Sequence, residues 1–387
     1  MKKLILLVFL SIAFTQTYAI DGIIIKTTDY SFSEKWNNNL SIPKLITSDT
    51  VFIGQNIFIT AIAGDYELNS DNQSIVEYSL KIIKPDNTIY FSQEKLPIIN
   101  SVLPDNKNLY MSEAILKMSF EENDLLGKYK IEIVVKDIVS GKSKKINSSL
   151  FVTKLPIEKK HVVENMNEFS NWFSHYYENP KPETALDYFI FYSNSKLAED
   201  DSRFYTMFSI FLEIFKNNKF LLPQIVDTYK QQEGKTQFFL IHLMYYSNIG
   251  AEEFLDGLEG NEKQYYLQLK ASEYPDLYGE ITNPSQLDML WATFLAGGSY
   301  KPIHKLITTL DYVKYSNELE KYKNSKNKTA ENRVKAVKNT VYTSLVWSIK
   351  SNCKQHNLVK GYAKWALKYG DLNDIQKVEL EKILNDI

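Results

Sequence analysis

The chain has 387 residues, with 45 lysines and arginines against 47 aspartates and glutamates, giving a formal net charge of −2. Only Arg203 and Arg333 are arginines, so the composition excludes a basic nucleic-acid-binding surface. A single cysteine, Cys353, excludes an intrachain disulfide, and the length favours two domains, each stabilised by its own core.

Residues 1–19 have the pattern of a secretory signal peptide. Lys2 and Lys3 precede an apolar stretch, and Ala19 supplies the small residue that signal peptidase requires. No cysteine follows, so the sequence predicts Sec export to the periplasm or the medium, and not a lipoprotein. The alternative is a retained N-terminal anchor. No later segment is long and apolar enough to span a bilayer, so we expect no membrane span after cleavage.

From residue 22 to residue 154 the hydropathy alternates with a period of two, which is typical of half-buried strands. The clearest case is 75–84, which ends at a turn, Pro85-Asp86-Asn87. Tyr129 is placed like the corner tyrosine of immunoglobulin-like domains. We therefore predict an immunoglobulin-like β-sandwich over 22–154. The expected strands are 22–27, 56–63, 75–84, 88–94, 113–120, 128–136 and 144–152.

After Leu155-Pro156, which we interpret as a linker, the period changes to 3.6 and predicts an α-helical domain over 158–387. Short connections indicate stacked helical hairpins, an irregular array of the tetratricopeptide-like or HEAT-like kind. The lysine-rich stretch 321–328 is expected to be a solvated loop. The predicted helices are 159–178, 182–197, 202–216, 219–232, 235–248, 251–258, 261–271, 284–296, 301–314, 329–352, 355–369 and 372–386.

The stretch 283–310 is the strongest helical hairpin in this domain. Asn283 is a good N-cap and Pro284 suits a first helical turn. Gly297-Gly298 is expected to end the first helix, because glycine adopts the left-handed conformation without a Cβ clash. A second helix then begins near Pro302 and runs antiparallel to the first.

Segments in both domains resemble a group of exported bacterial proteins. In the first domain these are 77–87, with its Pro85-Asp86-Asn87 turn, and 127–133, with the pattern GxYxI. In the second, 283–294 resembles NPxxLDxLWxxF and 347–359 resembles WSLxSNxxQHxxV. The resemblance implies an immunoglobulin-like sandwich followed by a tetratricopeptide-like helical domain. It implies no activity and carries over no catalytic residue.

Cys353 and His356 are three residues apart, a spacing that on a helix brings a thiol and an imidazole to one face. An envelope enzyme using this pair is one hypothesis. The other is that 352–355 is a turn between helices, with Cys353 a small buried residue. Neither CxxC nor HExxH occurs, so we predict no metal site and no cofactor.

An aromatic cluster at the start of the helical domain is a second candidate. It contains Trp172, His175, Tyr176 and Tyr177, which are expected either to pack the first helix or to form an aromatic interaction surface. Asp288 and Trp291 on the hairpin helix are further candidates for that surface. His242, within an apolar helix, is expected to be a core histidine.

We therefore predict an exported, non-catalytic binding or scaffold protein, whose helical array contacts a protein partner in the cell envelope. The alternative is a module that binds glycans or cell-envelope material through some of its 26 tyrosines. Tyrosines lining one cleft would favour the glycan hypothesis.

Overall fold

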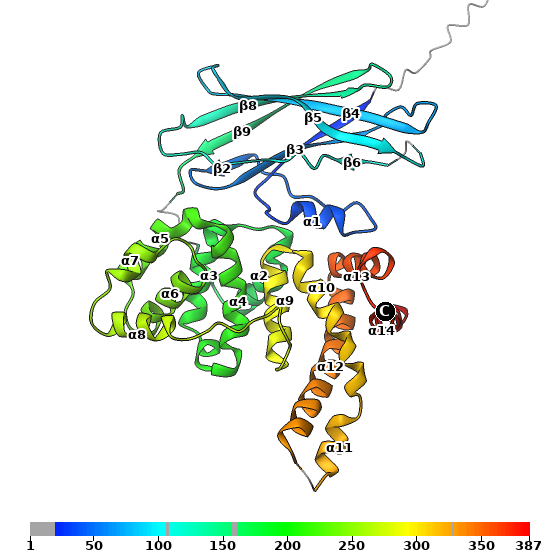
Figure 1. Cartoon of the computed structure of the whole chain (residues 1–387). Helices are drawn as coiled ribbons and strands as arrows, with labels where there is room; N and C mark the ends of the chain where they lie inside the picture. Colours follow the sequence, from blue (N-terminus) through cyan, green and yellow to red (C-terminus); the bar gives the residue numbers. More distant parts are fainter. Residues whose placement is uncertain (1–19, 106–107, 157–160, 327) are drawn as a thin grey trace, which may run out of the picture. The chain divides into compact units, whose positions relative to one another are not determined.

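The computed structural model describes residues 20–105, 108–156, 161–326 and 328–387 (Figure 1). The predicted signal peptide lies outside the described residues. Strands dominate the first part and helices the second, which confirms the predicted order of a β region followed by an all-helical region. Within the described ranges, none of the helices combines the length and the apolar character needed to cross a membrane.

The strands of the described part form two sheets. One has the order β2-β9-β8-β4-β5, with β2 (Thr50–Phe52), β9 (Ser143–Thr153), β8 (Gly127–Asp137), β4 (Gln73–Ile83) and β5 (Ile89–Val102). The other has the order β1-β3-β6, with β1 (Asp21–Thr27), β3 (Ile57–Gly64) and β6 (Tyr110–Met111), and β7 (Leu116–Met118) also pairs with β3. β4 is antiparallel to β8, with Tyr78 opposite Val135 and Leu80 opposite Ile133.

The period of two along β4 is a burial pattern. Its residues alternate between buried and half-buried, and Tyr78 and Leu80 are each 1% exposed. Tyr129 is buried, and its hydroxyl donates to the carbonyl oxygen of Leu125 at 2.9 Å. The corner tyrosines of immunoglobulin-like domains make a bond of this kind to backbone a few residues upstream.

The helices agree with the predicted set within a few residues at most ends. They are α2 (Met166–His175), α3 (Ala185–Ser193), α4 (Asp201–Asn217), α5 (Leu222–Gln231), α6 (Gly234–Tyr246), α7 (Glu252–Asp256), α8 (Gly260–Lys270), α9 (Ser285–Gly297), α10 (Tyr300–Thr308), α11 (Glu318–Asn324), α12 (Ala330–Gln355), α13 (Asn357–Tyr369) and α14 (Asp374–Asn385).

Several predicted elements differ from the structure; the helix expected at 301–314, for example, ends at Thr308 and is followed by a 3₁₀ helix over Thr309–Tyr315. The helix expected from residue 159 begins at Met166, because the Asn165 side chain caps it by accepting from the N–H groups of Asn167 and Glu168. The loop expected at 321–328 is partly helical, since α11 has an i,i+3 ion pair between Glu318 and Lys321. The turn expected at 352–355 is also wrong: α12 continues through Gln355.

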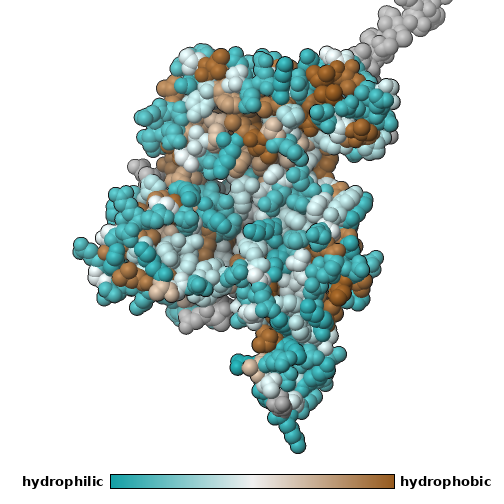
Figure 2. All heavy atoms as spheres, viewed as in Figure 1, coloured by the Kyte–Doolittle hydropathy of each residue, from teal (hydrophilic) through white to brown (hydrophobic). Residues whose placement is uncertain are grey.

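α11 has no buried residue, and hydrophilic side chains cover the end of the α11–α12 hairpin in Figure 2. Elsewhere the helices share one core. α4 packs along α9 although four helices separate them in sequence, and Figure 1 shows the two side by side.

The chain divides into two compact units. The β unit contains the described residues up to Lys26, Ile59–Lys117 and Leu125–Phe151; the helical unit contains Thr27–Phe58, Met118–Asp124 and Val152–Ile387. This division differs from the predicted domains, 22–154 and 158–387, because two segments of the predicted first domain, Thr27–Phe58 and Met118–Asp124, belong to the helical unit. One of them includes the short helix α1 (Phe32–Asn37), which the sequence analysis did not predict.

Candidate functional site

The segment that contains α1 binds to the joint between α9 and α10. The Ser31 hydroxyl donates to the carbonyl oxygen of Gly297 at 2.5 Å. Beside it, the Lys35 ammonium lies 2.6 Å from the Asp29 carboxylate, and both side chains are almost fully buried. A buried pair of opposite charges keeps both partners in place, because separating them would leave a charge without compensation.

Gly297-Gly298 ends α9 as predicted, and the structure gives each glycine a reason. Gly298 has φ of 71°, the left-handed conformation expected at a helix end. At position 297 a Cβ atom would lie 2.0 Å from the Tyr30 hydroxyl oxygen, so any larger residue would displace the Tyr30 side chain. Asn283 accepts from the N–H of Ser285 at 2.9 Å, and α9 begins at that serine, one residue later than predicted.

The Glu34 carboxylate closes the other side of this joint. It accepts hydrogen bonds from the Ser299 hydroxyl at 2.5 Å and from the N–H of Tyr300 at 2.7 Å. Tyr300 is the first residue of α10, where a negative charge interacts favourably with the helix dipole. A residue of α1 thus caps a helix far away in the sequence.

Next to Glu34 the helical unit has an open cavity of about 470 Å³, which we call the tyrosine cavity. Four tyrosines line it: Tyr30 from the α1 segment, Tyr246 from α6, and Tyr274 and Tyr278 from the loop before α9. Tyr246 and Tyr274 are in ring contact, with centroids 5.2 Å apart. Tyr278 is 40% exposed, so its ring is open to solvent at the rim.

Charged groups of both signs share the lining with these rings. The lining includes the carboxylates of Glu34, Glu213 and Asp276 and the ammonium groups of Lys216 and Lys301. The Asn217 amide holds one oxygen of Glu213 at 2.9 Å, and the Lys301 ammonium lies 4.1 Å from the centre of the Tyr278 ring.

Local hydrogen bonds set the protonation of this lining. Bonds from the N–H groups of Tyr278 and Gly279 lower the pKa of Asp276, so this carboxylate is an acceptor at neutral pH. Burial raises the pKa of Tyr278 to about 12 and also raises that of Tyr274. The Tyr274 hydroxyl lies 2.8 Å from that of Ser209. The cavity therefore offers protonated hydroxyls, carboxylate oxygens and ammonium donors around aromatic rings.

The predicted Cys353–His356 pair lies elsewhere, at the end of α12. Burial raises the pKa of the Cys353 thiol to about 11, the opposite of what a nucleophilic thiol needs. His356 is buried, and its Nδ1 lies 3.1 Å from the Tyr177 hydroxyl. Burial, followed by the neighbouring His175, lowers the pKa of His356. The pair is thus a protonated thiol and a neutral imidazole bonded to a tyrosine.

The predicted interaction surface is mostly core. Tyr176, Tyr177 and Trp291 are 4%, 5% and 7% exposed, and they belong to the main hydrophobic cluster of the helical unit. Trp172 stacks on Tyr188, with ring centroids 4.2 Å apart. These aromatic side chains therefore pack in or against the core of the helical unit. His175 and Asp288 are exposed.

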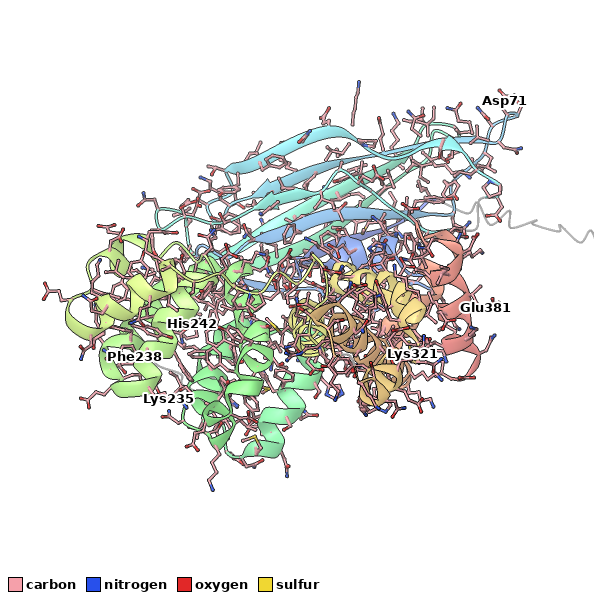
Figure 3. All side chains as sticks on the ribbon, turned by 60° about the horizontal axis from the view of Figure 1, so that its bottom comes forward. Asp71, Lys235, Phe238, His242, Lys321 and Glu381 are labelled. Carbon is pink, nitrogen blue, oxygen red and sulfur yellow. The ribbon has the colours of Figure 1, made fainter. Side chains whose placement is uncertain are left out.

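His242 is a core residue, as predicted. It lies one turn after Phe238 on α6 (Figure 3), and its Nδ1 is 3.1 Å from the Tyr265 hydroxyl. Burial lowers its pKa to about 4, so the imidazole is neutral at physiological pH. Among the described residues, no group of three or more histidine, cysteine, aspartate or glutamate side chains has the arrangement of a metal site.

Sequence reasoning missed the tyrosine cavity because its residues come from segments between Tyr30 and Pro302. No motif joins them. The only signal was the high tyrosine content, which does not say which rings share a cavity.

Comparisons with known proteins add little. No protein-family model matches the chain, and no curated protein matches it. A family 123 glycoside hydrolase from Clostridium perfringens is 15% identical, over 35% of this chain and 28% of that chain, with a TM-score of 0.19. The sporulation control protein Spo0M from Bacillus subtilis is 14% identical, over 36% of this chain and 51% of that chain, with a TM-score of 0.21. The match thus spans about a quarter of the glycoside hydrolase and about half of Spo0M.

Proposed function

We propose that this is an exported, non-catalytic binding protein that takes a neutral, polyhydroxylated ligand of the glycan class in the tyrosine cavity. The observation that supports the proposal is that four tyrosines from three segments line one cavity together with carboxylates and lysines. Concave sites that combine aromatic rings with a few oriented polar groups are the usual form of small-molecule sites.

The chemistry of the lining favours a sugar over other ligands. Sugar rings have apolar faces that pack on aromatic side chains, and their hydroxyls both donate and accept hydrogen bonds. The lining offers carboxylate acceptors, ammonium donors and hydroxyls that do both. Three carboxylates against two ammonium groups leave little net charge, so neither an anionic nor a cationic ligand is favoured.

The remaining parts of the chain fit an envelope role. We propose that the β unit is an immunoglobulin-like sandwich serving as a spacer, which its sheet orders β1-β3-β6 and β9-β8-β4-β5 support. We propose that the helices form an irregular tetratricopeptide-like array, with α9 and α10 as one of its hairpins. Residues 1–19 would direct export by the Sec pathway.

A protein partner in the cell envelope is the second candidate. It is favoured by Trp347 on α12, which is 72% exposed, because exposed tryptophans are frequent anchors of protein interfaces. In that case the helical array would act as a scaffold, and loss of Trp347 would release the partner while leaving glycan binding unchanged.

A glycan array tests the leading proposal. The chain from Ile20 onward would be applied as wild type, as Tyr278→Ala and as the control Tyr322→Ala, whose ring lies on α11 and does not line the cavity. We expect wild type and the control to capture the same neutral glycans and Tyr278→Ala to lose them. Capture of no glycan by wild type, or equal capture by Tyr278→Ala, would contradict the proposal.

A further inference from the structure

A second cavity, of about 340 Å³, adjoins the tyrosine cavity within the helical unit. Glu34 and Lys301 line both cavities. They form the wall between the two cavities. The rest of the lining of this second cavity comes mainly from α10 and α13, which pack against each other. We call it the tryptophan cavity, after Trp365.

The tryptophan cavity repeats the chemistry of its neighbour with different residues. Trp365 and Tyr369 are four residues apart on α13 and therefore share one face, with ring centroids 6.3 Å apart. Tyr300 meets Trp365 edge to face, with centroids 5.3 Å apart. His304 and Asp371 add polar groups to this lining.

Two features suit this cavity to a ligand. Tyr369 is 59% exposed, so its ring is accessible to a ligand. The Tyr300 hydroxyl is buried and has no hydrogen-bond partner in the described part of the chain. A buried hydroxyl without a partner is costly, so a binding group that reaches it would gain more than the bond itself.

The wall between the cavities is itself polar. Glu34 is held by the N-terminus of α10 and so keeps its carboxylate in place, whereas the Lys301 stem extends toward the ring of Tyr278. A chain of sugar units that passed over this wall would meet an acceptor and a donor between two aromatic platforms.

We propose that the two cavities are adjoining subsites of one groove for an unbranched oligosaccharide, with sugar units on both sides of Glu34 and Lys301. This rests on the proposed glycan-binding function and adds the length of the ligand to it. A ligand confined to the tyrosine cavity would gain nothing from Trp365 or Tyr369.

Calorimetric titration with two oligosaccharide series tests the groove. The probes are β-1,4-linked N-acetylglucosamine and α-1,4-linked glucose, each from the monosaccharide to the hexasaccharide. For wild type we expect affinity to rise by about tenfold between the short and the long members of the series that binds, because only the long members reach the second aromatic platform.

Variants separate the subsites. Trp365→Ala and Tyr369→Ala are expected to remove the gain with length and leave the affinity for short members unchanged, whereas Tyr278→Ala weakens all members. Tyr369→Ala changes an exposed side chain, so it remains informative if Trp365→Ala does not fold. A length dependence that persists in Tyr369→Ala, or equal wild-type affinity for all lengths, would overturn the groove while leaving the tyrosine cavity supported. Failure of wild type to bind either series would contradict the function itself.

Discussion

Glu34 accepts a hydrogen bond from the backbone N–H of Tyr300 at 2.7 Å, although 266 residues separate the two in sequence. The bond explains why an N-terminal segment belongs to the helical unit. α1 is too short to be stable by itself, and it exists because its side chains cap α10 and pack at the α9–α10 joint. The same carboxylate lines both cavities, so the folding contact and the candidate site share one residue.

Removing this cap should destabilise the protein. We expect Glu34→Ala to lower the free energy of unfolding by about 1–2 kcal/mol, because the Ser299 hydroxyl and the Tyr300 N–H lose their acceptor. Glu34→Gln retains an acceptor oxygen and should cost less, about 0.3–1 kcal/mol. Urea unfolding measures both variants. Wild-type stability in Glu34→Ala would show that the carboxylate does not cap α10.

A methyl group at position 297 should force the α1 segment away from α9. Its Cβ would lie 2.0 Å from the Tyr30 hydroxyl and 2.4 Å from the ring carbon that carries it. We expect Gly297→Ala to cost about 1–3 kcal/mol by overpacking. In the double variant with Tyr30→Ala, the cost of Gly297→Ala should largely disappear.

Gly257→Ala is the matched control, because its nearest neighbours would lie 3.5 Å from the new Cβ. Its stability should stay within about 0.5 kcal/mol of wild type. Equal effects of the two glycine substitutions would argue against the close approach of Tyr30 to α9.

The thiol of Cys353 should be inert in the folded protein. With a pKa of about 11 it is almost entirely protonated at neutral pH, and its side chain is buried. We expect an aromatic disulfide reagent at about pH 8 to modify Cys353 only after the protein is unfolded in urea. Rapid modification of the native protein would instead revive the hypothesis of an enzyme that uses Cys353 and His356.

His242 should make stability depend on pH in a defined direction. Burial holds its folded pKa at about 4, below the value of about 6.5 in the unfolded chain. Between pH 4 and pH 6.5 the unfolded state binds more protons at His242 than the folded state does. The stability that the neutral, buried imidazole contributes is therefore complete above about pH 6.5 and is lost as the pH falls toward 4.

Between pH 7 and pH 5 the loss attributable to His242 should be about 2 kcal/mol. Urea unfolding at both pH values, for wild type and His242→Gln, measures it, with circular dichroism to verify that both proteins stay folded at pH 5. A variant that loses as much stability as wild type over this interval would show that His242 is not the group responsible.

Local patterns predicted the helices and strands well where one face of the element is buried. The hairpin helix was expected at 284–296 and is found at Ser285–Gly297, because its apolar spacing and terminal glycines act within the segment itself. α1 was missed because six residues are too few to show a period, and α11 because it buries no side chain. Both depend on contacts or ion pairs that a hydropathy pattern does not contain.

The candidate site was harder to predict than the fold. The sequence drew attention to Trp172 and Tyr177 because aromatic residues are adjacent there, but adjacency on a short helix placed them in the core. Tyr30, Tyr246 and Tyr278 are isolated in sequence and meet only through tertiary packing. A single sequence therefore does not indicate which tyrosines share a cavity.

The most direct test of the account is calorimetric titration of the chain from Ile20 onward with the hexasaccharide of β-1,4-linked N-acetylglucosamine and with that of α-1,4-linked glucose. Wild type and Tyr322→Ala should bind one of the two with equal affinity, and Tyr278→Ala should bind it at least about tenfold more weakly. Absence of heat with both hexasaccharides in wild type, or an unchanged affinity in Tyr278→Ala, would contradict a glycan site in the tyrosine cavity.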